Sequence, residues 1–165
     1  MEIRMNSRMG EILDTFNIEL SILRVSLPES IHDLLRQGIV HTDKMYLLKA
    51  MMPASLNLQA YFDLTDAECT INHVHIDDYF NDMDRSQAVR VGIKSTVAIA
   101  NLLISQYPGE KFYVVLGLDN DLSSPTVRFY KVREHEPQWL RIEQLEEYDD
   151  AVLVVSTEDI SVSAS

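Results

Sequence analysis

The stretch that decides the fold is residues 84–107, DRSQAVRVGIKSTVAIANLLISQY, which carries the longest helical pattern in the chain. Its apolar side chains recur every three or four residues, so they lie on one face of a helix. They are Val89, Ile93, Val97, Ala100 and Ile104. Asp84 and Gln87 have the spacing of a capping box, which satisfies free N–H groups of the first turn. Because Pro108 and Gly109 follow, we predict one long central helix that ends before them.

The chain after this helix has the pattern of β-structure, with short apolar runs separated by turn residues. Strands are expected over 111–119, 126–133, 139–142 and 151–156. Residues 120–125 are expected to form a loop, and residues 143–148 a helical turn. The end of the chain, 159–165, lacks any such periodicity, so we expect it to be a frayed tail.

The chain before the central helix has a helical pattern first and an alternating pattern later. Helices are expected over 9–25, 28–37 and 42–52. The first is defined by apolar residues spaced four or three apart, namely Met9, Leu13, Phe16, Leu20 and Leu23. Alternation over 57–64 predicts a half-buried strand. A turn over 65–68 then leads to a second strand over 69–76, so this region is a predicted hairpin.

The order of these elements predicts an α+β fold with N-terminal helices, a long central helix and a mainly antiparallel β-sheet. The chain has 165 residues, with no linker and no internal repeat in its sequence. That length suits one compact domain, so residues 1–165 are expected to form a single domain.

The composition is acidic, because 26 Asp and Glu residues against 14 Lys and Arg residues give a formal charge of −12. A polyanion repels such a chain, so nucleic acid is not expected as a partner. The sequence has no run of 18 apolar residues, so no membrane is expected either. The first residues show no signal-peptide pattern, and Cys69 is the single cysteine, so we expect a cytoplasmic protein.

Signatures of common enzymes are missing from the sequence. The five glycines are too far apart for a phosphate-binding or dinucleotide-binding loop. There is no Gly-x-Ser-x-Gly elbow, and Cys69 lacks a nucleophile motif. The sequence therefore assigns no catalytic residue and no cofactor and favours a protein that is not an enzyme. An enzyme whose residues converge only in the folded chain stays open.

One segment has the side chains of a metal site. On a strand, His73, His75 and Asp77 point to the same side, and imidazoles with a carboxylate suit zinc or iron. The run resembles the His-x-His-x-Asp-His run of metallo-β-lactamase-fold hydrolases, although Asp78 stands where that family has its last histidine. The resemblance implies a small metal-dependent hydrolase. The alternative is two exposed histidines on an edge strand beside an acidic loop.

The negative charge is concentrated in two segments. Residues 50–84 contain seven acidic residues and no Lys or Arg, and residues 143–150 contain five acidic residues. Tyrosines lie among these acids, and aromatic rings beside carboxylates are typical of a surface that binds a basic protein. The predicted partner-binding residues are Asp77, Asp78, Tyr79, Asp82, Glu146, Glu147, Tyr148, Asp149 and Asp150. The alternative is a solvated surface that only keeps the protein soluble.

A small, acidic α+β chain without a catalytic motif resembles the bacterial immunity proteins that neutralise toxins. The resemblance rests on size, acidity and the missing motif, and it implies a basic toxin domain, such as a nuclease, as the partner. Carboxylates would then occupy the toxin's phosphate-binding cleft. A homodimeric regulatory or scaffold domain is a further alternative, in which the apolar residues of the first helix form a dimer seam instead of part of the core.

Overall fold

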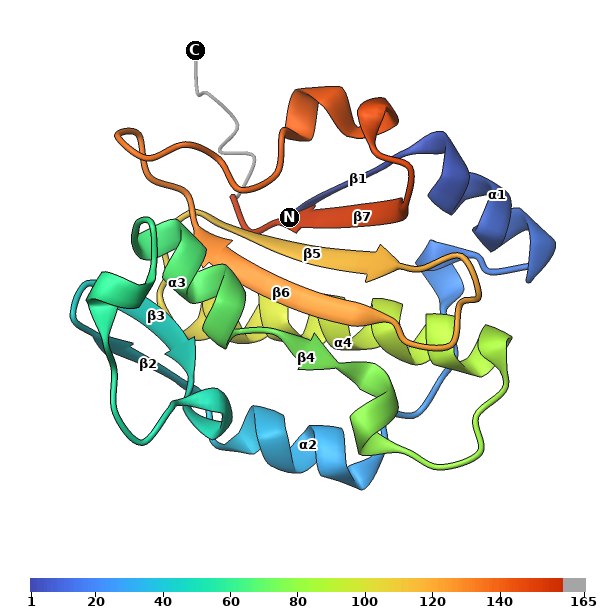
Figure 1. The fold of residues 1–165 in the computed structure, drawn as a ribbon. Coiled ribbons are helices and arrows are strands. Elements are labelled where there is room, and N and C mark those ends of the chain that lie inside the picture. The colour runs from blue at the N-terminus through green and yellow to red at the C-terminus, as the bar shows by residue number, and fades with distance from the viewer. Residues whose placement is uncertain (159–165) are drawn as a thin grey trace, which may run out of the picture.

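A five-stranded antiparallel sheet forms the centre of the fold (Figure 1). The computed structural model describes residues 1–158, so the frayed tail expected over 159–165 lies outside the described residues. The strand order is β1-β7-β5-β6-β4, and every neighbouring pair is antiparallel. The strands are β1 Glu2–Met5, β4 Val74–His75, β5 Phe112–Leu118, β6 Thr126–Lys131 and β7 Ala151–Ser156. The predicted α+β class with a mainly antiparallel sheet is confirmed.

The long helix α4, Arg85–Gln106, packs against this sheet, and the predicted central helix is confirmed. Its capping box is complete: Gln87 N donates to the Asp84 carboxylate at 2.8 Å, and Asp84 N donates to the Gln87 side chain at 3.2 Å. By length and apolar composition α4 could cross a membrane, but 56% of its most apolar window is buried inside this fold. The core therefore accounts for its apolar face.

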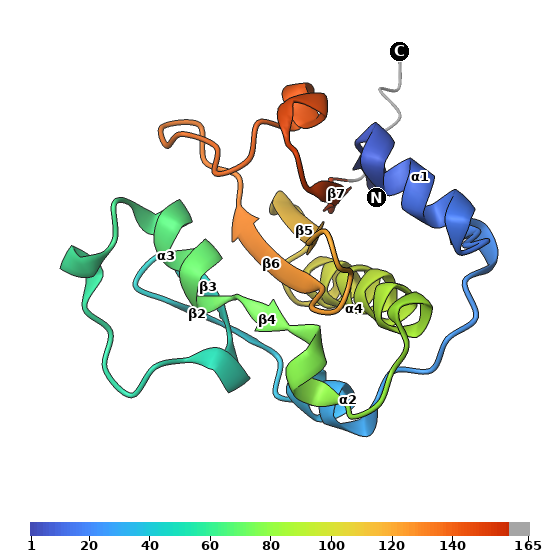
Figure 2. The same ribbon diagram turned by 45° about the vertical axis from the view of Figure 1, so that its right-hand side comes forward.

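Helix α4 covers one face of the main sheet (Figure 2), and the two faces bury different side chains. Alternate residues of a strand point to opposite faces, so Val114 joins the main core and its neighbour Val115 joins a second, smaller core. The main core lies between the sheet, α4 and α1, Ser7–Thr15. The second core lies under α3, Leu64–Ile71, and the 3-10 helix η5, Ile142–Glu147.

The first predicted helix is shorter than expected. α1 starts after Asn6, whose side chain accepts from Met9 N at 3.1 Å, and it ends at Thr15. Asn17 has a φ of 51°, which a helix cannot accommodate, and only the 3-10 helix η1, Leu20–Ile22, follows. The five apolar residues of the predicted helix all belong to the main core or pack against it, which favours the core interpretation over a dimer seam.

The helix predicted over 28–37 is confirmed as α2, Glu29–Arg36, but the helix predicted over 42–52 is wrong. Residues 39–48 form a separate antiparallel hairpin of β2, Ile39–Thr42, and β3, Met45–Leu48. The turn between them has φ values of 48° at Asp43 and 66° at Lys44, and two left-handed residues close a tight hairpin. The 3-10 helix η2, Lys49–Met51, follows this hairpin.

The hairpin predicted over 57–76 is also wrong. Residues 57–64 contain the 3-10 helix η3, Leu58–Ala60, and the start of α3. Asp63 caps α3 by accepting from Asp66 N at 2.7 Å, so the predicted turn over 65–68 lies within a helix. Of the strand predicted over 69–76, only the two residues of β4 are extended, and the 3-10 helix η4, Ile76–Tyr79, follows at once.

The C-terminal predictions are confirmed except for one strand. β5, β6 and β7 lie where strands were expected, and η5 lies over the predicted helical turn. Residues 139–142 form no strand, however. The edge position beside β7 is taken by β1 from the other end of the chain, which the sequence pattern did not predict.

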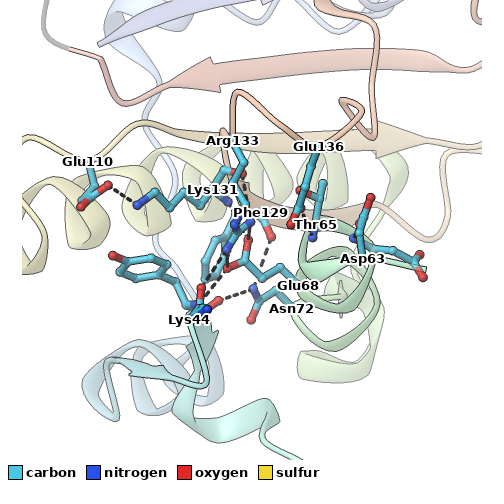
Figure 3. Close-up of polar contacts among 12 residues, drawn as sticks. Lys44, Asp63, Thr65, Glu68, Asn72, Glu110, Phe129, Lys131, Arg133 and Glu136 are labelled. Atoms are coloured by element: carbon cyan, nitrogen blue, oxygen red, sulfur yellow. Dashed lines mark hydrogen bonds and ion pairs between the residues drawn. The ribbon is translucent and has the colours of Figure 1, made fainter. Parts of the chain in front are cut away.

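A buried carboxylate on α3 joins the β2–β3 hairpin to the main sheet (Figure 3). Glu68 is fully buried and accepts from Tyr46 N of β3 at 2.8 Å and from Lys131 N of β6 at 2.7 Å. Its two oxygens also accept from the Arg133 guanidinium at 2.6 and 2.9 Å. One turn further along α3, Asn72 accepts from Leu48 N at 2.9 Å. α3 therefore links the two sheets through side-chain hydrogen bonds.

The Glu68–Arg133 ion pair is shielded from water, with 0% and 13% of the two side chains exposed. Burial lowers the pKa of Arg133, but the hydrogen bonds and charge of Glu68 outweigh that effect, so the pKa of Arg133 is raised overall. Removing one partner of such a pair leaves an uncompensated buried charge, which is strongly destabilising.

We expect Glu68→Gln to lower the free energy of unfolding by about 3–5 kcal/mol, because Arg133 would lose its counter-charge in a dry site. Urea denaturation followed by circular dichroism measures the loss. Glu29→Gln is the matched control, because Glu29 pairs with Arg36 in water, and exposed pairs contribute little. Equal stability of the two variants would contradict the role assigned to Glu68.

Candidate functional site

Parts of both predicted acidic segments, residues 77–84 and 149–150, lie at the same end of the sheet. Asp63, Asp66 and Glu68 of the first segment lie on α3 or at its start, and Glu68 contacts the opposite end of β6 at Lys131 N. Leu118, the last residue of β5, pairs with Ala151, the first residue of β7, so Asp119 and Asp150 both lie one residue beyond the last pair. His75, the last residue of β4, pairs with the first residue of β6. The chain leaving β4 is therefore at this end too.

The resulting surface, which we call the acidic end, crosses the sheet from β7 to β4. These strands are three strand spacings apart, or about 14 Å. The aspartates that follow or precede the strand ends, together with the two before α4, make up this surface. They are Asp77, Asp78, Asp82, Asp84, Asp119, Asp121, Asp149 and Asp150.

Four arginines lie near the acidic end, but they do not neutralise it. Arg128 of β6 borders the same hollow as Asp149 and Asp150. Arg8 of α1 hydrogen-bonds the side chain of Asn120, and Arg85 acts on Asp121 through its charge. Arg90 of α4 donates to the backbone carbonyl of Phe16 at 2.9 Å. Eight aspartates against four arginines leave a negative field that attracts a basic partner and repels phosphates.

The loop between β5 and β6 holds two aspartates whose carboxyl groups titrate differently. Partial burial and the neighbouring Asp121 raise the pKa of Asp119. Hydrogen bonds from Ser123 lower the pKa of Asp121, whose carboxylate accepts from Ser123 Oγ at 2.6 Å. Ser124 of the same loop donates to Asp77 at 2.6 Å and so ties the loop to η4.

A hollow of about 660 Å³ opens beside this loop. Phe16 from the end of α1 and Met83 from the segment before α4 give it apolar walls. Asp84, Arg85 and Ser123 place polar groups at its edge. An apolar hollow with the Asp84 carboxylate at its edge suits the long side chain of a lysine or arginine, whose methylene groups and charged end need both surroundings.

Several residues that the sequence predicted for partner binding already have partners within the chain. Glu146 accepts from Ser7 N at 2.9 Å, and Glu147 pairs with Arg141 at 2.9 Å. The two tyrosines are only half-buried, but their hydroxyls are engaged. Tyr148 Oη accepts from Arg141 N at 3.0 Å, and Tyr79 Oη lies 3.8 Å from the Met51 sulfur.

The remaining predicted residues are more open to a partner. Asp78, Asp82, Asp149 and Asp150 are exposed. The aspartates of the β5–β6 loop and the hollow beside it were not predicted as parts of this surface. The strands predicted on either side of residues 120–125 could have indicated them, because a loop between two antiparallel strands lies at one end of the sheet, beside the other loops of that end.

The predicted metal segment does not assemble. The strand ends at His75, and η4 turns Asp77 away toward Ser124, so the three side chains do not share one strand face. The His73 and His75 rings lie 4.2 Å apart. Within residues 1–158, no group of three His, Cys, Asp or Glu side chains is arranged to hold a metal ion.

His73 instead lies in surroundings that disfavour its charged form. Its Nε2 atom is buried with no hydrogen-bond partner among the described residues. Burial first, and then the nearby charges of Arg128 and His75, lower the pKa of His73 to about 4 from its usual 6.5. The imidazole is therefore neutral in the folded protein at neutral pH.

We expect this histidine to make the fold sensitive to mild acid. Between about pH 6.5 and pH 4 the unfolded chain binds a proton at His73 that the folded chain does not, so stability falls as the pH falls. Urea denaturation at several pH values should show a weaker loss for His73→Gln than for the natural protein. His135→Gln, in the exposed loop after β6, controls for losing an imidazole elsewhere. Identical pH profiles for His73→Gln and the natural chain would refute the assignment.

Comparison with known proteins identifies a family for this chain. No curated protein and no solved structure matches it. A family model described as the Uncharacterized protein PM0498 family matches residues 4–164. That match includes every strand except the first residues of β1, together with the acidic end and the Glu68 network. The chain belongs to the PM0498 family.

Proposed function

We propose that this chain is a cytoplasmic binding protein whose acidic end docks onto a basic protein. The observation that carries the proposal is the strand register, which gathers acidic segments far apart in the sequence along one end of the sheet. Negative charge that served only solubility would not need to be concentrated at one end of the sheet. The hollow beside the β5–β6 loop adds the concave apolar surface that an anchor side chain needs.

The finer form of the proposal is an immunity protein that blocks a toxin domain. A nuclease toxin binds phosphates in a basic cleft, and carboxylates spaced along the acidic end would compete for the same cations. Electrostatic attraction of this kind raises association rates and discriminates between partners. The size, acidity and missing catalytic motifs of the chain support this form.

Within the acidic end, we assign the strongest contacts to Asp78, Asp149 and Asp150, because they are exposed and have no ion-pair partner among residues 1–158. Glu146 and Glu147 would first have to give up their bonds to α1 and Arg141. They are therefore assigned to the rim, where charge pairs contribute less.

The tagged full chain, captured from its source cells at low ionic strength, should retain a basic protein that high salt releases. We expect Asp78→Lys and Asp149→Lys to slow association with that protein about tenfold or more each, because both reverse a charge in the attracting field. Surface plasmon resonance measures the rates. For a nuclease toxin, the complex should also lose nuclease activity.

Glu134→Lys is the matched control, since it makes the same charge change in the exposed loop after β6, away from the acidic end. It should leave the association rate close to that of the natural chain. An equal effect of all three substitutions would show that only net charge matters. That result would overturn the assignment of the acidic end as the docking surface.

A further inference from the structure

A second hollow, of about 510 Å³, lies on the outer face of the sheet, opposite α4. Its floor is formed by β5, β6 and β7 through Val115, Thr126 and Val152. One side is bordered by Arg128 and Trp139. The other side is bordered by residues 147–150, which lead from η5 into β7. The volume is in the range of sites for small molecules.

Arg128 is a half-buried cation whose charge is not balanced. Its Nη1 donates to the Cys69 carbonyl of α3 at 3.0 Å, and its guanidinium lies 5.1 Å from the centre of the Trp139 ring. Within residues 1–158 no carboxylate lies within 4 Å of it. Burial lowers its pKa. A desolvated cation without a counter-charge is unfavourable and would gain from a bound anion.

The side of the hollow that faces Arg128 is negatively charged. Asp149 and Asp150 are exposed and border it, and neither forms an ion pair within the described part of the chain. Glu147 also borders it but is paired with Arg141 at 2.9 Å. The hollow thus has a cation on one side and two free carboxylates on the other.

Gly117 keeps the floor of the hollow open. It lies in β5, where every other residue is bulky and buried, and glycine weakens a strand interior. Its φ is not positive, so its backbone conformation does not require glycine. A Cβ at this position would lie 3.3 Å from Thr126 Oγ1 and project into the hollow. The missing side chain therefore leaves space above the sheet.

We propose that this hollow binds a small zwitterion of the free amino acid class. The carboxylate would pair with Arg128, the ammonium group with Asp149 and Asp150, and an apolar side chain would fill the space above Gly117. This inference goes beyond the docking of a protein partner. It shares Asp149 and Asp150 with the acidic end, whereas Arg128, Trp139 and Gly117 take no part in the proposed docking.

The charge of the chain favours a zwitterion over a simple anion. A ligand that carried only a carboxylate or a phosphate would meet Arg128 but also the two aspartates and an overall charge of −12. An amine alone would leave Arg128 without a counter-charge. A zwitterion satisfies both sides, and charge-assisted hydrogen bonds to both of its ends give it an orientation.

The test uses the fluorescence of Trp139, which is the single tryptophan of the chain and borders the hollow. We titrate the protein with L-leucine and with L-phenylalanine up to about 10 mM, which is about ten times the Kd of a weak ligand that binds at about 1 mM. A saturable change in fluorescence is expected. 3-Phenylpropanoate, which lacks the amine, and 2-phenylethylamine, which lacks the carboxylate, should bind at least tenfold more weakly than L-phenylalanine.

Two variants address the two parts of the site separately. Arg128→Gln removes the charge and should weaken amino acid binding at least tenfold, whereas Arg36→Gln, on exposed α2, should not weaken it. Gly117→Val fills the floor with a residue that favours strands, so it should fold and yet lose binding. Gly10→Ala adds a methyl group where nothing lies within 4 Å and is the control.

The proposal is overturned by the absence of any saturable response in the natural protein. It is equally overturned if Arg128→Gln and Gly117→Val, both verified as folded by circular dichroism, bind as the natural protein does. Equal binding of 3-phenylpropanoate and L-phenylalanine would refute the part assigned to Asp149 and Asp150. Arg128→Gln and Gly117→Val leave Asp78, Asp149 and Asp150 in place, so a loss of amino acid binding in these variants does not test association with a basic protein, and the two proposals fail separately.

Discussion

Glu68 reaches from α3 into the space between the β2–β3 hairpin and the main sheet, which are not paired strand to strand. Its carboxylate accepts two backbone N–H groups that the strands would otherwise leave without partners, and it neutralises Arg133 in the same place. A buried charge is stable only where hydrogen bonds and an opposite charge compensate it to this extent. Asn72 completes the junction with bonds to Leu48 N and to the carbonyl of Tyr46. The position of α3, and with it the Cys69 carbonyl that holds Arg128, follows from this contact.

The parts of the fold that the sequence predicted are those whose signals are local. The α4 helix has a capping box at its start, an apolar face along its length and Pro108 and Gly109 after its end. The strands β5, β6 and β7 are short apolar runs with turn residues between them. The helix expected over 42–52 failed because its apolar spacing also fits β3, a strand with all four residues buried. The left-handed turn at Asp43 and Lys44 and the pairing of β2 with β3 distinguish the observed hairpin from the expected helix. The alternation over 57–64 likewise carried no sign that Asp63 caps a helix.

The candidate surface was predicted in part, for a related reason. Sequence identified the acidic segments over residues 50–84 and 143–150, because charge can be counted along the chain. It could not place them at one end of the sheet, since that depends on the pairing of Leu118 with Ala151 and of His75 with Thr126. It also could not show that Glu146 is used to hold the start of α1. The unbalanced charge of Arg128 was invisible, because a missing partner is a property of the folded chain.

The pairing of β1 with β7 places Glu2 opposite Ser156, so the two ends of the described chain are neighbours in the sheet. β1 can pair with β7 only after the residues up to Ser156 have left the ribosome, and the edge of the apolar β5 that pairs with β7 stays uncovered until then. The same closeness means that a short peptide could join the two ends, and new ends could be opened in an exposed loop. The same sheet could thus be formed by chains in which these strands follow one another in a different order.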